Sequence, residues 1–217
     1  MIEGFSVVAI DGGAGTGKST TAAIVSERLN FLHVDTGAHY RSITKYLLDE
    51  NLGLNEIENF FDNHLLELSS QVVGKRSILA INKRIYQVDD LRSEEVNRRV
   101  SEVATIPRVR EILFDYQREQ IEFARKLDFS GVVMEGRDIG SVILPDAKLK
   151  VFLVADQEVR ESRRLNDGEI DQIASRDEID SNRHIAPLIE SAGSLRIDTS
   201  QLSVEEVFSA IRAKILA

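Results

Sequence analysis

A glycine-rich segment that leads directly into lysine and serine, GGAGTGKS at residues 12–19, constrains this chain more than any other feature. It satisfies the pattern G-x-x-x-x-G-K-[ST] and lies between an apolar run, Val7–Ile10, and an amphipathic helical segment. In that context backbone N–H groups turn inward around phosphate oxygens, and the N-terminus of the helix adds positive potential. The motif therefore predicts an α/β fold that holds a nucleoside triphosphate.

We expect the whole loop to take part in nucleotide binding. Lys18 would reach the β- and γ-phosphates, and the Ser19 hydroxyl would be a Mg²⁺ ligand. The residues assigned to the nucleotide are Gly12, Gly13, Ala14, Gly15, Thr16, Gly17, Lys18, Ser19 and Thr20. A glycine turn that merely joins a strand to a helix would need neither Lys18 nor Ser19, and the spacing is not that of a dinucleotide loop.

The rest of the chain alternates short apolar runs with helical patterns, which is typical of a buried parallel sheet with crossover helices. Two helices have clear start signals: a proline at Pro107, and a capping box formed by Ser203 and Glu206. The five predicted strands are Ser6–Ile10, Phe31–Val34, Gly131–Met134, Leu149–Val154 and Ser194–Ile197.

One segment interrupts this alternation. Between Gln71 and Val88, three strand-like runs are separated by turn-forming residues, which predicts a small antiparallel meander outside the main sheet. We place this β insert within residues 62–92 of a single domain that spans residues 1–217.

Polar residues follow the second and third predicted strands. Thr36 is expected to be the N-cap of the next helix, and Arg41 would project from its first turn. Arg137 and Asp138 follow the third strand, close to Glu135. Because ligands bind at the carboxyl ends of the strands in such sheets, these residues should lie beside the phosphate loop. A surface arginine on a capped helix and an internal Arg–Asp ion pair are the alternative interpretations.

Two arginine groups occur in the second half of the chain, and an Asn-Asp-Gly turn at residues 166–168 lies between them. Their members are Arg160, Arg163 and Arg164 in the first group, and Arg176, Asp180 and Arg183 in the second. Each group lies on one helix face. A hairpin over residues 160–183 could close as a lid and place arginines against a transferred phosphoryl group, although solvated helix faces would give the same pattern.

The composition limits the classes of function. The chain of 217 residues has a net charge of −9, which argues against a nucleic-acid binder, and it has no cysteine for disulfides or thiolate metal sites. No apolar run is long enough for a membrane helix, and the first residues lack the basic region of a signal peptide. We therefore expect a cytoplasmic protein that does not associate with membranes.

Several segments together are similar to the bacterial cytidylate (CMP/dCMP) kinases over nearly the full length of the chain. They are AIDGGAGTGKST, FLHVDTGAHYR, the 71–88 insert, VSEVATIPRVR, EGRDIGSVILPDAKLKVFL, SRDEIDSNR and SLRIDTSQLSVEEV. The resemblance implies a P-loop NTPase three-layer fold with a five-stranded parallel sheet, a small antiparallel β insert and a short helical lid. It also implies transfer of the γ-phosphoryl group of ATP, with Mg²⁺, to CMP or dCMP.

The resemblance implies roles for individual positions as well. The matching substrate-binding positions are Thr36, Arg41, Ser101, Arg110, Arg137, Asp138, Asp180 and Arg183. The expected catalytic residues are Lys18, Arg163, Arg176 and Arg183. Ser101 and Arg110 rest on the resemblance alone. The departures from the family pattern are Gly13 in place of proline, Glu135 in place of aspartate, Ile179 and Ser181 in place of lid arginines, and a lid about ten residues shorter.

Two other functions fit part of the pattern. One is a kinase with the same core and another acceptor, such as shikimate or dephospho-coenzyme A; the insert and the DTGAHYR segment argue against it. The other is a nucleotide-binding switch without turnover, against which the intact Lys18 and Ser19 argue.

The attacking oxygen of a phosphate acceptor is already ionised, so His33 and His39 are not needed as bases. A monomer is expected, and the preference between CMP and dCMP is left open.

Overall fold

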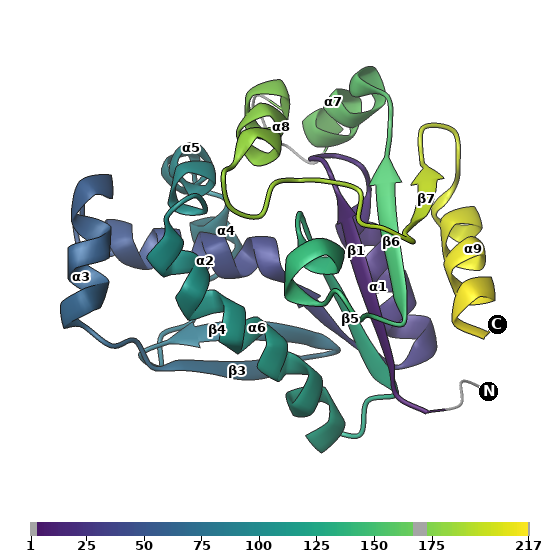
Figure 1. The fold of residues 1–217 in the computed structure, drawn as a ribbon, viewed down its shortest axis with the longest axis horizontal. Helices are drawn as coiled ribbons and strands as arrows, with labels where there is room; N and C mark the ends of the chain where they lie inside the picture. The colour runs from purple at the N-terminus through teal and green to yellow at the C-terminus, as the bar shows by residue number, and fades with distance from the viewer. Residues whose placement is uncertain (1–3, 167–172, 217) are drawn as a thin grey trace.

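The computed structural model describes residues 4–166 and 173–216, and for residues 173–176 it describes the backbone alone. A seven-stranded sheet forms the middle of the molecule, with the strand order β3-β4-β2-β5-β1-β6-β7 and helices around it (Figure 1). The strands are β1 (Ser6–Gly12), β2 (Phe31–Asp35), β3 (Leu68–Val73), β4 (Arg76–Ile81), β5 (Gly131–Gly136), β6 (Leu149–Val154) and β7 (Leu195–Asp198). All five strands predicted for the parallel sheet are present.

Successive side chains of the central strands point to opposite faces of the sheet, and apolar side chains on both faces explain why helices cover both. On β1, Val8 and Ile10 pack in a cluster with residues of the helices α1 (Lys18–Leu29) and α9 (Val204–Leu216). Ala9, on the other face, belongs to a cluster with residues of α6 (Pro107–Lys126) and η2 (Ile139–Ile143). All three of these side chains are fully buried. The three-layer α/β arrangement expected from the sequence is therefore confirmed.

The helices and helical turns follow the order of the chain. They are α1 (Lys18–Leu29), α2 (Thr36–Asp49), η1 (Leu54–Glu56), α3 (Ile57–Asn63), α4 (Val88–Leu91), α5 (Glu94–Val103), α6 (Pro107–Lys126), η2 (Ile139–Ile143), α7 (Gln157–Asn166), α8 (Ile173–Asn182) and α9 (Val204–Leu216). Pro107 is in the first turn of α6, as predicted. No helix in the described ranges, residues 4–166 and 173–216, has both the length and the apolarity needed to cross a membrane.

The insert differs from the prediction, because it extends the main sheet instead of standing apart from it. β3 and β4 form an antiparallel hairpin, and β4 pairs in parallel with β2 at His33 and Val34. The third run forms no strand: after Ile81 the chain turns at Asn82 and Lys83, which both have positive φ. The physical reason is the free edge of β2, whose backbone groups need partners; the His33 N–H donates to the carbonyl of Lys75 at 2.8 Å.

The two arms of the predicted lid are the helices α7 and α8, which lie beyond the carboxyl ends of β1 and β6 (Figure 1). Asn166 ends α7. The remainder of the predicted turn, residues 167–168, lies outside the described residues. The boundaries assigned to the insert and the lid, 62–92 and 160–183, stay predictions.

The capping box at the start of α9 generates a stability prediction. The Ser203 hydroxyl accepts a hydrogen bond from the Glu206 N–H at 3.3 Å, and the Glu206 carboxylate accepts one from the Ser203 N–H at 2.8 Å. Ser203→Ala should lower the free energy of unfolding by about 1 kcal/mol in urea denaturation, because an N-cap hydroxyl satisfies a helix N–H. Ser209→Ala, at an exposed site within the same helix, should be neutral or slightly stabilising. Equal effects of the two changes would contradict the capping role.

Candidate active site

The phosphate loop joins β1 to α1 at the carboxyl end of the sheet. Its turn requires glycine where φ is positive, at Gly15 (73°) and Gly17 (88°). Lys18 is only 8% exposed, and its ammonium donates to the carbonyl of Gly13 at 2.7 Å. Burial, followed by the charge of Arg137, lowers the pKa of Lys18 to about 7. The protein groups around Lys18 thus stabilise its positive charge poorly.

Ser19, the residue expected to bind the metal, lies in a set of oxygen groups. Its hydroxyl donates to one carboxylate oxygen of Glu135 at 2.8 Å, and the other oxygen of Glu135 is 2.8 Å from Nε2 of His33. Hydroxyl and carboxylate oxygens are the donors that Mg²⁺ prefers, so the residues present fit this metal. Among the described residues no group of three or more His, Asp or Glu side chains could hold a metal by itself.

His33, which was not expected to act as a base, makes a contact that the sequence analysis did not predict. It is 2% exposed in the middle of β2, next to the strand that carries Glu135. A histidine within an otherwise apolar strand is the signal that could have indicated a polar partner. The imidazole orients the carboxylate that contacts Ser19.

Thr36 is not the N-cap of α2, which corrects the prediction. The N-cap is Asp35, whose extended backbone lets its carboxylate accept from the Ala38 N–H at 3.0 Å. Asp35 reaches the first turn from one residue earlier, so Thr36 becomes the first helical residue. The Thr36 hydroxyl instead donates to the carbonyl of Glu135 at 2.7 Å, which ties α2 to the end of β5.

Arg41 projects from α2 toward the helices that follow the insert. Its guanidinium donates to the carbonyl of Leu91 at 2.9 Å and to the side-chain oxygen of Asn97 at 2.5 Å. Asn97 and the buried Ser101 are on the same helix, α5. Two of the predicted acceptor-side residues are therefore connected through α5, which Arg41 contacts and which carries Ser101.

Most of the remaining acceptor-side residues form ion pairs in two groups, one of two residues and one of three. Arg110 of α6 contacts Asp138, Arg137 donates from Nε to Asp180 at 2.7 Å, and Arg183 contacts the other oxygen of Asp180. Burial raises the pKa of Asp138 in spite of the nearby charges of Arg110 and Arg183. Arg–Asp ion pairs, the alternative interpretation given above, are present. They join different segments of the chain and do not pair Arg137 with its neighbour Asp138.

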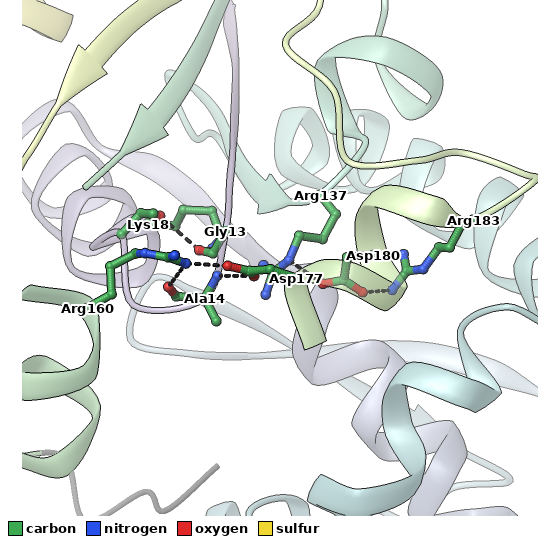
Figure 2. Close-up of polar contacts among 9 residues, drawn as sticks. Gly13, Ala14, Lys18, Arg137, Arg160, Asp177, Asp180 and Arg183 are labelled. Carbon is green, nitrogen blue, oxygen red and sulfur yellow. Dashed lines mark hydrogen bonds and ion pairs between the residues drawn. The ribbon is translucent and has the colours of Figure 1, made fainter. Parts of the chain in front are cut away.

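The helices α7 and α8, predicted to be the arms of a lid, lie against the phosphate loop. Arg163 donates to the carbonyl of Thr199 at 2.7 Å and to that of Gly15 at 3.4 Å, so this predicted catalytic residue contacts the loop backbone. Arg160, one of the arginines expected in the lid, forms an ion pair over the loop with Asp177, to which the sequence assigned no role (Figure 2). The side chain of Arg176, also predicted to be catalytic, lies outside the described residues.

Asp11 is a second residue that sequence reasoning missed. It ends the apolar part of β1 and is 3% exposed. Its two carboxylate oxygens accept from the N–H groups of Ile139 at 2.8 Å and Gly140 at 2.7 Å. The contact fixes the segment of Arg137 and Asp138 beside the phosphate loop. An aspartate directly before the glycine motif is the signal that could have found it.

Asp11 predicts a pH dependence of stability. Burial raises its pKa from 3.8 to about 6, so its stabilising contribution is complete below the ordinary value and is lost as the pH rises through about 6. Between about pH 7.5 and about pH 5, the wild type should gain about 1.4 kcal/mol of unfolding free energy more than Asp11→Asn. Urea denaturation of both proteins at both pH values measures the difference; the same pH dependence in both would contradict the shifted pKa.

Comparison with known proteins adds an independent line of observation. The family model described as cytidylate kinase matches residues 8–216. A cytidylate kinase of Desulforamulus reducens is 41% identical over 221 residues, with 94% of each chain covered. One of Clostridioides difficile is 38% identical over 220 residues, covering 96% of this chain and 97% of the relative. A solved structure of an uncharacterized protein from Eubacterium ventriosum covers 97% of this chain and 98% of its own, with a TM-score of 0.50 and 14% identity, a likeness of fold alone. This chain belongs to the cytidylate kinase family.

Proposed function

We propose that this protein transfers the γ-phosphoryl group of ATP to CMP or dCMP, giving ADP and CDP or dCDP. The observation that carries the proposal is the position of α8. Its Asp177 contacts the phosphate loop, and its Asp180, three residues later, contacts Arg137 and Arg183. A triphosphate site and a group of cations for a second anion therefore lie side by side, as transfer between two phosphates requires.

The donor's phosphates would occupy the loop, with the N–H groups of residues 12–19 and the Lys18 ammonium as donors. A bound triphosphate supplies the negative charge that raises the lowered pKa of Lys18 and keeps the side chain charged. Mg²⁺ is the metal we propose, held by the Ser19 hydroxyl with Glu135 nearby; when bound, it neutralises phosphate charge. Lys18 and Ser19 thus fix the donor's terminal phosphate near Arg137.

The acceptor would bind on the other side of α8. Arg137 and Arg183 suit its phosphate, because guanidinium groups pair with phosphate oxygens in two-point contacts. Arg110 and Asp138 suit its base: a carboxylate accepts from the amino group of cytosine, and a guanidinium donates to ring acceptors. A uracil carbonyl in the place of the amino group would face the carboxylate unfavourably, so this pair favours cytosine.

The reaction needs little from the protein besides position and charge. The attacking oxygen belongs to a phosphate that is largely ionised at neutral pH, so no side chain has to remove a proton. Lid arginines such as Arg163 would stabilise the charge on the transferred group and exclude water, which would otherwise hydrolyse the donor. A cytoplasmic location and a monomeric state belong to the same proposal.

An ADP-release assay tests the function directly. The wild type should turn over with ATP and Mg²⁺ when CMP or dCMP is the acceptor, and turnover should be much slower with UMP, AMP or shikimate. Lys18→Ala should lose at least about 100-fold in turnover, because its cation stabilises charge in the transition state. Turnover with shikimate or AMP in preference to CMP would contradict the acceptor assignment. ATP binding without turnover on any acceptor would favour a nucleotide switch.

A further inference from the structure

A side chain of the lid makes the contact that a bound anion would make. The Ala14 N–H, in the middle of the phosphate loop, donates to a carboxylate oxygen of Asp177 at 3.0 Å, although the two residues are 163 positions apart in the chain. The other oxygen of Asp177 contacts the guanidinium of Arg160, which also donates to the Ala14 carbonyl at 3.2 Å. Figure 2 shows the carboxylate in contact with both Ala14 and Arg160.

The cations of the site are arranged around this carboxylate. The negative charge of Asp177 favours the charged forms of both Lys18 and Arg137, in addition to its direct contact with Arg160. Lys18 and Arg137 are the residues proposed to hold the donor's and the acceptor's phosphates. Asp177 therefore places its negative charge where the electrostatic field and the loop N–H both favour a phosphate oxygen.

Gly13 makes this close approach possible. A Cβ atom at this position would lie 3.0 Å from one carboxylate oxygen of Asp177 and 3.1 Å from the Arg160 guanidinium. Such contacts are tighter than side chains normally adopt, so a larger residue would push the pair away from the loop. Glycine at position 13, where the family pattern has proline, therefore leaves free the space that the pair occupies.

We propose that Asp177 is an internal substitute for phosphate that occupies the loop of the nucleotide-free protein and competes with the donor's phosphates. This inference rests on the proposed function only in taking the loop as the donor site. To bind a triphosphate, the protein must break the contact between Asp177 and Ala14 and release Arg160 from its carboxylate. The contact is autoinhibitory: it lowers donor affinity and couples donor binding to movement of α8.

Titration calorimetry with ATP and Mg²⁺, in the absence of any acceptor, tests the proposal. Asp177→Asn and Asp177→Ser should bind ATP about tenfold more tightly than the wild type, since no charged contact has to be broken first. Inorganic tripolyphosphate is the second probe and should show the same gain, because it contains the phosphate chain alone. Thermal melts of both variants verify that they are folded.

Glu178→Gln is the matched control, because Glu178 is the exposed next residue of α8 and the change removes the same charge. Its ATP affinity should stay within about twofold of the wild type, since exposed charges are screened. Equal or weaker ATP binding by the Asp177 variants would overturn the proposal, and so would an equal gain in Glu178→Gln. If ATP fails to bind while tripolyphosphate shows the tenfold gain, the ATP assignment is wrong and the role of Asp177 holds.

Discussion

Buried charge at the carboxyl edge of the sheet is the constraint on which the arrangement of this protein depends. Asp11, Glu135 and Asp138 all follow or end central strands, and each is less than 5% exposed. A buried carboxylate is costly unless hydrogen bonds or opposite charges compensate for the lost water. Here two backbone N–H groups, a hydroxyl with an imidazole, and a guanidinium provide that compensation. Each partner comes from another element, so satisfying the charges also brings the functional segments together.

The need to compensate buried charge also explains the position of α8. The helix contributes two aspartates: Asp177 contacts the phosphate loop, and Asp180 contacts Arg137 and Arg183. Because helical residues three apart lie on neighbouring positions of one face, a single helix can serve both sites. A movement of α8 would therefore change the surroundings of both proposed substrate sites at once. If α7 and α8 act as the proposed lid, its closure and the approach of the two substrates would be one event.

The sequence was informative where local rules decide the structure. The five parallel strands, the proline start of α6 and the capping box at Ser203 follow from patterns within a few residues, and all are present. The phosphate loop was readable for the same reason. The acceptor-side residues were found partly through their place after strands, whereas Ser101 and Arg110 needed the family resemblance.

What could not be predicted depends on contacts between distant segments. The pairing of β4 with β2 is decided by the free edge of β2, which no local pattern reports. The hydrogen bonds of Asp11 and His33 join residues more than 100 positions apart. The N-cap of α2 was misplaced by one residue, because Asp35 and Thr36 are both good capping residues and only the backbone decides between them.

The central claim is direct transfer between two phosphates held on either side of α8, and following the phosphorus atom tests it most directly. The protein would be incubated with γ-³²P-labelled ATP, Mg²⁺ and CMP, and the labelled products separated by chromatography. Direct transfer predicts that the label appears in CDP, with one labelled CDP for each ADP formed. Label that accumulates as inorganic phosphate while CMP stays unchanged would contradict the account, because it would mean that water and not CMP accepts the phosphoryl group.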